Sequence, residues 1–393
     1  MLYFLPQIFI GTSGWSYKDW IGPFYKRKQN LFSQYSEIFN TTEINSTFYS
    51  IPTYGFMKQL SRAAPPGFKF SLKLYKGLTH KKLLNPKLGV LDDLEVFLKN
   101  IQPLKRNGML GAILIQMPPK PPLAFPYFEE FLSNLPSDNY QFAVEFRHPE
   151  WLSDEYFKLL EESNVAYVVV DEPLLPSIVK VTSDFSYFRW HGRGQRPWYY
   201  YLYSEEELKE WVPKVKEAID KGKVFYGYFN NHFRGYAPKN ALQMLSFLGV
   251  ANRRQRLKLK EIDRYFKETA QEKTKEAVMR VIESGDREQI IKEFSGGKRF
   301  ERALDIPDSA VDVKAEDRRI EAKVKEYMVV IDLDEKIIIH NCEDWRKRVD
   351  SKKFCKHVAK VFLMIPKEKA LKVLNDIVSN FEEWSFVYDG EGV

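Results

Sequence analysis

The pattern that most constrains the fold is an alternation of apolar runs with amphipathic segments between residues 8 and about 250. The runs have the length of buried strands, and most are followed by a polar loop and a segment of helical periodicity. Strands that alternate with helices form parallel sheets, and eight such units in about 240 residues match the size of a (β/α)8 barrel. The predicted strands span residues 8–14, 41–48, 68–75, 110–117, 141–147, 166–172, 185–192 and 223–231.

A doubly wound open sheet is the competing architecture for this alternation. Its dinucleotide-binding members carry a GxGxxG turn that opens a helix directly. The turn after the first predicted strand reads GTSGWSYKDW, which lacks that spacing and does not lead straight into a helix. We therefore predict an α/β fold with a TIM-type barrel over residues 1–250.

Nearly every predicted strand ends in a polar or ionisable residue, and the carboxyl ends of the strands carry the chemistry of such barrels. Buried polar groups are costly unless they are paired or used, so their concentration at one end indicates a pocket. An internal ion pair is the alternative for Glu145 and Arg147, which lie two residues apart on one strand face. The catalytic candidates are Glu43, Lys73, His80, Glu145, Arg147, His148, Asp171 and His191.

These residue types suit phosphodiester chemistry. Arg147, Arg189 and Lys73 offer donors that match phosphate oxygens, and the carboxylates could hold a second divalent metal, Mg²⁺ or Mn²⁺. Aromatic rings beside cationic groups hold unstacked bases of single strands, although core packing is the alternative for each ring. The nucleic-acid-binding candidates are Trp15, Tyr17, Tyr49, Trp190, Asn230, His232, Arg253 and Arg254.

Colinear stretches between residues 8 and 245 carry a resemblance to a known family. They include IGTSGWSYKDW, FNTTEINSTFYSIP, VEFRHPEW and YFNNHFRGYAPKNA. These stretches resemble the YecE-like barrels, which are known as domain of unknown function 72. The resemblance implies a TIM-type barrel whose pocket is lined by the polar strand ends, and it supplies no reaction.

The pattern changes after residue 250. RRQRLKLK (253–260) opens a basic helical linker that we expect to span residues 251–294. Short β-like pieces follow between residues 310 and 342, then a helix-period segment at 353–365 and a closing helix that starts near Pro366. We predict a second, smaller α+β domain over residues 295–393.

The stretch HNCEDWRKRVDSKKFCKH (340–357) contains both cysteines of the chain and two of its six histidines. His340 and Cys342 share one face of a predicted strand, and Cys355 and His357 lie near the start of the next helix. Two thiolates and two imidazoles form a closed tetrahedral set that suits a structural Zn²⁺. The alternative is a pair of buried free cysteines with surface histidines nearby.

The same stretch resembles the SWIM zinc-finger family, whose pattern is Cys-x-Cys, a variable spacer and Cys-x-His. His340 stands where that pattern has its first cysteine. The resemblance covers roughly residues 295–366, including KRFERALDI, which is similar to the hairpins before the SWIM ligands. It implies a zinc-binding ββα element in a module that binds DNA, RNA or protein.

The net charge of +7 permits an anionic partner. No apolar run is long enough to span a membrane and no export signal is recognisable, so we expect a cytoplasmic protein without a membrane partner. The favoured function is a metal-assisted nuclease that prefers single-stranded DNA, with the zinc finger gripping the strand. The alternatives are a non-catalytic binding protein with a pocket for a phosphate-bearing ligand, and a sugar-phosphate or glycosidic enzyme. The oligomeric state is left open.

Overall fold

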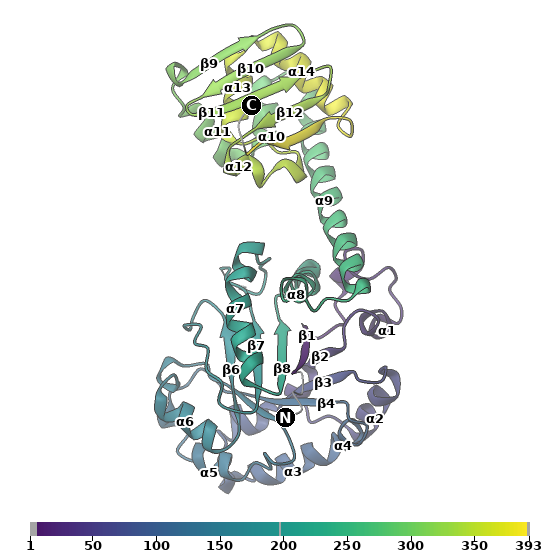
Figure 1. Cartoon of the computed structure of the whole chain (residues 1–393), viewed down its shortest axis with the longest axis vertical. Helices are drawn as coiled ribbons and strands as arrows, with labels where there is room; N and C mark the ends of the chain where they lie inside the picture. Colours follow the sequence, from purple (N-terminus) through teal and green to yellow (C-terminus); the bar gives the residue numbers. More distant parts are fainter. Residues whose placement is uncertain (1–5, 196–197, 391–393) are drawn as a thin grey trace. The chain divides into compact units, whose positions relative to one another are not determined.

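The computed structural model describes residues 6–195 and 198–390. The chain divides into two compact units, residues 1–262 and 263–393 (Figure 1). The predicted linker, residues 251–294, therefore contributes to both units. The long helix α9 (Arg253–Ile282) is shared in the same way. Gln255 donates to the carbonyl oxygen of Ile38 in the first unit, and Thr274 donates to that of Ser351 in the second.

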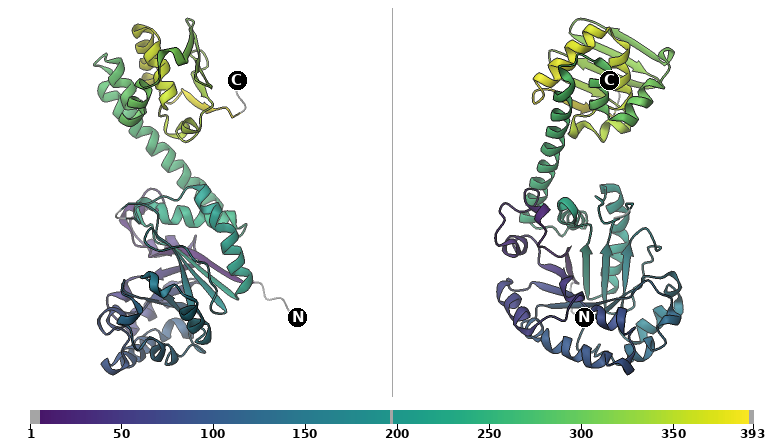
Figure 2. Two further views of the ribbon diagram at one scale, coloured as in Figure 1. Left: turned by 90° about the vertical axis from the view of Figure 1, so that its left-hand side faces the viewer. Right: turned by 180° about the vertical axis from the view of Figure 1, so that it is seen from behind.

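The first unit is a closed barrel of eight parallel strands in sequence order, which confirms the predicted fold class (Figure 2). Pairing of β1 with β8 closes it. All eight predicted strands are present, but each ends one to four residues before its predicted end. The strands are β1 (Gln7–Ser13), β2 (Thr41–Ile44), β3 (Lys69–Lys73), β4 (Leu110–Gln116), β5 (Phe142–Glu145), β6 (Ala166–Asp171), β7 (Phe185–Trp190) and β8 (Val224–Phe229).

Helices surround the barrel, so the strands are buried on both faces and read as continuous apolar runs. The capping box of Ser204 and Glu207 fixes the start of the longest helix that lies wholly in this unit. The described residues 172–184, between β6 and β7, contain no helix. The α-helices are α1 (Leu31–Ser36), α2 (Tyr54–Ala63), α3 (Val90–Asn100), α4 (Gln102–Arg106), α5 (Phe128–Ser133), α6 (Asp154–Glu162), α7 (Glu205–Lys221) and α8 (Tyr236–Phe247).

Side chains fill the barrel interior. Every second strand residue points inward, and apolar side chains such as Val168 and Tyr187 form one buried cluster there. The hydroxyl of Tyr228 lies 2.7 Å from that of Thr41 and 2.9 Å from that of Ser71. Because the interior is packed, a ligand can approach these inward-facing residues only from the strand ends.

The second unit is a five-stranded sheet in the order β13-β12-β11-β10-β9. Its strands pair antiparallel except β12 and β13, which are parallel. Helices lie against one face of this sheet (Figure 2). The elements are β9 (Val311–Ala315), β10 (Arg319–Val324), β11 (Tyr327–Asp332), β12 (Ile337–His340), β13 (Ser385–Tyr388), α10 (Arg287–Ser295), α11 (Gly297–Leu304), α12 (Glu343–Arg346), α13 (Lys356–Met364) and α14 (Lys367–Ser379).

Two features of this unit differ from the sequence-based prediction. KRFERALDI forms α11 instead of a hairpin, because Phe300 and Ala303, three residues apart, bury one helix face. The predicted closing helix, α14, is followed by the short edge strand β13. None of the helices in the described part of the chain is both long and apolar enough to cross a membrane.

Candidate functional site

Polar side chains converge at the mouth of the barrel, where the strands end. They project inward because they continue the every-second-residue pattern of the interior. Most of the predicted catalytic residues meet here. We call the following set the mouth cluster: Glu43, Lys73, Gln116, Glu145, Arg147, Glu172, Arg189, His191 and Asn230.

Arg189 joins two fully buried carboxylates at the centre of the mouth cluster. Its Nη2 donates to Glu43 Oε1 at 2.8 Å, and its Nη1 donates to Glu145 Oε2. The Tyr187 hydroxyl donates to Glu43 Oε2 at 2.7 Å, and Gln116 Nε2 donates to Glu145 Oε1 at 2.6 Å. Each of the four carboxylate oxygens therefore accepts at least one hydrogen bond, so the expected second divalent metal would have to compete with these donors for Glu43 and Glu145.

Electrostatics favour the charged forms of Glu145 and Arg189. Burial would raise the pKa of Glu145, but Arg189, a hydrogen bond with His191 and then Arg147 hold it well below its usual range. Burial opposes the charge of Arg189, and Glu145 and Glu43 raise its pKa nevertheless. Because Arg189 is 1 % exposed and already paired twice, it is not available to the phosphate for which the sequence suggested it.

Arg147 extends this network of ion pairs from Glu145 toward solvent. Its Nη1 lies 3.0 Å from Glu145 Oε1 and 2.7 Å from Glu172 Oε2, so the internal ion pair considered from the sequence exists. Burial raises the pKa of Glu172, and Arg147 counteracts that rise. The side chain of Arg147 is 20 % exposed, and its Nε and Nη2 make no hydrogen bond within the described residues. One side of this guanidinium thus faces solvent.

Lys73, at the end of β3, has different surroundings. Lys73 is 9 % exposed, and its Nζ lies 4.0 Å from the centre of the Phe48 ring. Burial and then the charge of Arg189 lower the pKa of Lys73 to about 8. The imidazole of His80 packs edge-on against the same ring at 5.1 Å, and burial and then Lys73 lower its pKa as well.

His191 is an internal hydrogen-bonding group. Its Nδ1 lies 3.0 Å from Asn230 Nδ2, and its Nε2 lies 3.8 Å from Glu145 Oε1. Burial and then Arg189 lower its pKa to about 4, so the imidazole is neutral at pH 7. Its Nε2 also lies 3.3 Å from Arg189 Nη1, a group that can only donate.

Three predicted catalytic residues lie outside the mouth cluster: His80, which packs on Phe48, and Asp171 and His148. Asp171 faces the helices, where Arg193 Nε lies 2.9 Å from its Oδ2 and Trp211 Nε1 lies 3.1 Å from it. Its neighbour Glu172 points inward instead, because successive strand residues alternate between faces. His148 accepts the backbone N–H of Glu150 at 3.4 Å, at the start of the short helix η6 (Pro149–Trp151).

The predicted aromatic residues differ in how they are used. Trp190 is buried and stacks on Phe229 at 4.5 Å between centroids, so core packing accounts for it. Tyr17 stacks on His232 at 4.6 Å. Trp15 packs edge-on against Phe32 at 5.2 Å. Tyr49 is 67 % exposed, with Lys76 Nζ 5.2 Å from its ring centre.

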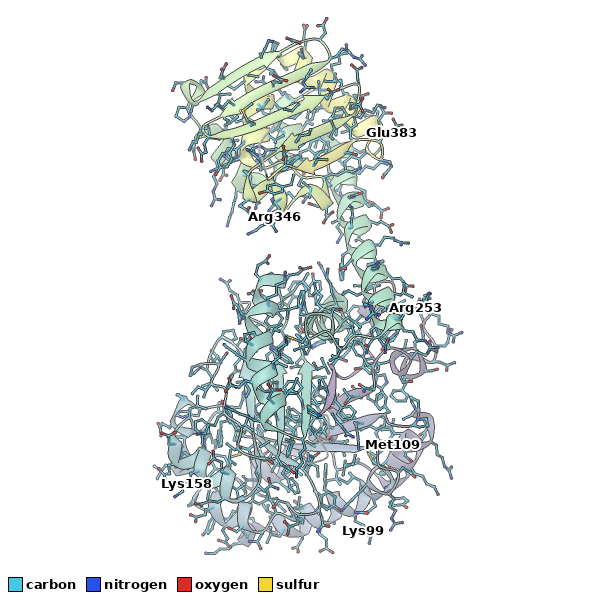
Figure 3. The ribbon with its side chains drawn as sticks, in the orientation of Figure 1. Lys99, Met109, Lys158, Arg253, Arg346 and Glu383 are labelled. Carbon is cyan, nitrogen blue, oxygen red and sulfur yellow. The ribbon has the colours of Figure 1, made fainter. Side chains whose placement is uncertain are left out.

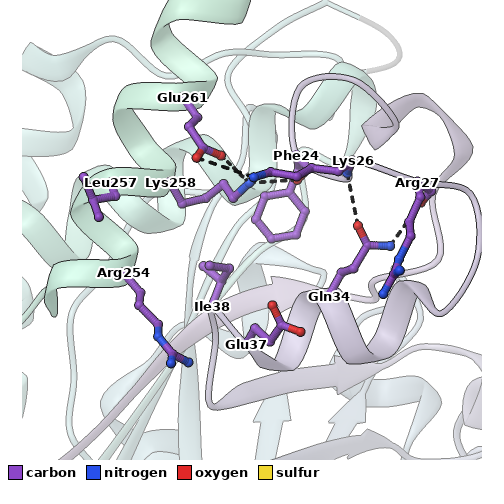
Figure 4. A pocket seen from close by; sticks show the side chains of 10 residues that line it. All are labelled: Phe24, Lys26, Arg27, Gln34, Glu37, Ile38, Arg254, Leu257, Lys258 and Glu261. Carbon is purple, nitrogen blue, oxygen red and sulfur yellow. Dashed lines mark hydrogen bonds and ion pairs between the residues drawn. The ribbon is translucent and has the colours of Figure 1, made fainter.

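Arg253 and Arg254 lie in the first turn of α9, where Figure 3 labels Arg253, and neither belongs to the mouth cluster. Arg254 lines a separate pocket of about 690 Å³ (Figure 4). The pocket lies between the connection from β1 to α1, the residues just after α1, and the start of α9. It is lined by Phe24, Lys26, Arg27, Gln34, Glu37, Ile38, Arg254, Leu257, Lys258 and Glu261.

The second unit brings together His340, Cys342, Cys355 and His357. One ligand atom of each lies within 4.8 Å of the others, and all four residues are buried. His340 ends β12, while Cys342 and Cys355 are the N-cap residues of α12 and α13. The two ligand pairs meet as predicted, but Cys342 lies beyond the end of β12 and caps α12 instead of continuing the strand.

The surroundings of this cluster fit a zinc ion. His340 Nδ1 lies 2.6 Å from the Met328 carbonyl oxygen, which fixes the ring so that Nε2 faces the cluster. The backbone N–H of Trp345 donates to Cys342 Sγ at 3.3 Å, and that of Val358 to Cys355 Sγ at 3.5 Å. Such donors at helix starts favour thiolates. A hydrogen bond from Cys355 lowers the pKa of Cys342, whereas burial raises that of Cys355.

The sequence model of a protein family described as "Protein of unknown function DUF72" matches residues 9–264. The chain belongs to the DUF72 family. The UPF0759 protein YunF of Bacillus subtilis is 26 % identical over 274 residues, which cover 62 % of this chain and 95 % of that protein.

Solved structures agree with the assignment to the DUF72 family. A DUF72 family protein from Thermotoga maritima is 34 % identical with a TM-score of 0.56, covering 62 % of this chain and 99 % of that one. One from Enterococcus faecalis is 22 % identical with a TM-score of 0.54, covering 63 % and 97 %, and shows the fold. The DUF72 match ends at residue 264, so the His/Cys cluster lies outside it.

Reasoning from the sequence identified part of the mouth cluster and its contacts. It named Arg189 as a phosphate donor but left it out of the catalytic candidates, it chose Asp171 although Glu172 faces the mouth, and it did not name Tyr187. The spacing of Tyr187, Arg189 and His191 by two residues is a signal that could have placed all three on the inner face of β7. Their partners on β2 and β5 could not be read from that spacing.

Proposed function

We propose that this DUF72 barrel binds a phosphate-bearing ligand at the carboxyl ends of its strands, and that single-stranded nucleic acid is the favoured ligand. The observation that carries the proposal is the presence of two cationic side chains, Lys73 and Arg147, with unused donors at the mouth. Arg189 bridges Glu43 and Glu145 and offsets one of their two charges, and Arg147 pairs with Glu145 as well. The mouth therefore offers donors to an anion.

Both the phosphates and the bases of a single nucleic-acid strand have candidate partners in this proposal. The free side of the Arg147 guanidinium suits phosphate oxygens, and Lys73 adds a second donor. The exposed ring of Tyr49, beside Lys76, suits stacking of an unpaired base. A metal-assisted nuclease built on Glu43 and Glu145 is less favoured, because a metal would have to displace Arg189 from both carboxylates.

In the second unit, His340, Cys342, Cys355 and His357 would hold a structural zinc. The ion would fasten the end of β12 to the start of α13 and leave no coordination position for chemistry. The loop between the ligand pairs presents Arg346 and Lys347 to solvent. We propose that this SWIM-like element adds a second contact to the nucleic acid, which supports binding and not turnover.

Titration of the full-length, zinc-loaded chain with a fluorescently labelled 20-nucleotide single strand tests the proposal. We expect affinity that falls steeply with salt, and Arg147→Gln should reduce the salt slope by about 1. Lys223→Gln is the matched control, because Lys223 is exposed at the opposite end of the barrel and pairs with Asp184. Absence of salt-dependent binding, or equal slopes for both variants, contradicts the proposal.

A further inference from the structure

We propose that Lys73 is a nucleophile that forms a Schiff base with the aldehyde of a phosphate-bearing substrate. The inference rests on the proposed phosphate site and names its substrate class: an aldehyde that lies close to a phosphate group. An abasic site in a nucleic-acid strand and a small phosphorylated sugar share this chemistry.

The partners of the buried lysines single out Lys73. Among the described residues, three lysines are buried: Lys73, Lys352 and Lys360. The Nζ of Lys352 donates to the carbonyl oxygen of Phe381 at 2.6 Å, and that of Lys360 lies 2.6 Å from Asp308 Oδ1. The Nζ of Lys73 has neither a hydrogen bond nor an ion pair with a described residue, and it rests against an aromatic ring. Buried ammonium groups without an oxygen partner are costly, which indicates a use for this one.

The charges around Lys73 favour the reactive form of its amine. An amine adds to a carbonyl only when uncharged, and desolvation or neighbouring cations activate it. Burial and then Arg189 lower the pKa of Lys73 from 10.5 to about 8, a shift that Glu145 and Glu43 only partly oppose. At neutral pH the uncharged share is roughly a hundredfold larger than for an ordinary lysine.

The proposed step balances without an additional oxidant or metal. The uncharged Nζ adds to the carbonyl carbon, the carbonyl oxygen leaves as water with two hydrogens from nitrogen, and a C=N bond replaces the C=O bond. His80, which packs on the same Phe48 ring, is a neutral imidazole that can move the proton. Arg147 has donors available to the phosphate of the substrate.

Reductive trapping tests the inference. The full-length protein is incubated with sodium cyanoborohydride and either an abasic-site oligonucleotide or glyceraldehyde 3-phosphate, and the adduct is located by peptide mass spectrometry. We expect a single adduct on Lys73 in at least one arm, and the arm that reacts identifies the source of the aldehyde. Glyceraldehyde without phosphate should react at least about tenfold more slowly if Arg147 selects the phosphate.

Lys73→Met should abolish the adduct. Lys69→Met is the matched control on the same strand: Lys69 lies at the amino end of β3, where its Nζ donates to the Gly108 carbonyl oxygen at 2.7 Å. Adducts spread over exposed lysines, or equal trapping in Lys73→Met, would overturn the inference. Binding of a single-stranded oligonucleotide without an aldehyde is measured separately. Binding without trapping would refute the Schiff base alone, whereas absence of binding would refute the phosphate site.

Discussion

Arg189→Met is the substitution that best separates a structural network from a catalytic one. Arg189 contacts Glu43 and Glu145, which are both 0 % exposed. After the change Glu145 keeps Arg147 at 3.0 Å, whereas Glu43 keeps only the Tyr187 hydroxyl at 2.7 Å. Removing one partner of a buried ion pair typically costs about 3–5 kcal/mol, because the other charge remains buried.

We therefore expect Arg189→Met to lower the free energy of unfolding of the first unit by about 4 kcal/mol at pH 7. Urea denaturation of the zinc-loaded chain, followed by intrinsic fluorescence, measures it. The double variant Glu43→Gln with Arg189→Met should recover part of the loss, because it removes the uncompensated charge. A loss below about 1 kcal/mol, the range of exposed ion pairs, would refute the reasoning.

The pH dependence gives a second check on the same network. The folded-state pKa of Glu145 is held well below its usual 4.5, despite burial, chiefly by Arg189. A carboxyl with a depressed folded pKa contributes stability above its unfolded pKa, and this contribution is lost as pH falls toward the folded pKa. The stability of the parent protein should therefore fall below about pH 4.5, and that of Arg189→Met should fall less steeply.

Three further changes have expected outcomes. Lys73→Met should raise stability by about 3 kcal/mol at pH 7, because the folded-state pKa is about 8 against 10.5. This gain should shrink as pH rises from 8 to 10.5, because Lys73 of the folded parent protein is uncharged in that range. A gain that stays constant with pH in urea titrations would contradict the lowered pKa of Lys73. Removal of zinc by a chelator, or the substitution Cys355→Ser, should lower the melting temperature of the second unit. The reason is that binding of a structural zinc supplies roughly 10–16 kcal/mol in zinc-finger peptides. Elemental analysis that finds no zinc in the parent protein would exclude the site. Tyr49→Ala should weaken single-strand binding by about 1–3 kcal/mol in the fluorescence titration while the melting temperature stays unchanged, because the ring is 67 % exposed. Unchanged affinity would remove Tyr49 from the interface.

The sequence by itself determined the barrel and the composition of the His/Cys cluster. Eight apolar runs separated by loops and helices predicted eight parallel strands, because a strand buried on both faces must be apolar along its whole length. His340 and Cys342 could be paired with Cys355 and His357 since each pair lies within three residues and the segment between them is short. Local periodicity and short spacing carry this information.

Only the tertiary structure decided which polar groups are partners. Arg189 meets Glu43 across 146 positions of sequence and Glu145 across 44, and closure of the barrel creates both contacts. Alternation places Asp171 and Glu172 on opposite faces of β6, but the sequence alone did not show which of the two faces is the inner one. Contacts between strands that are distant in the sequence decide whether a buried cation is paired. Arg189 is paired with two carboxylates, whereas Lys73 rests against the Phe48 ring with its donors unused.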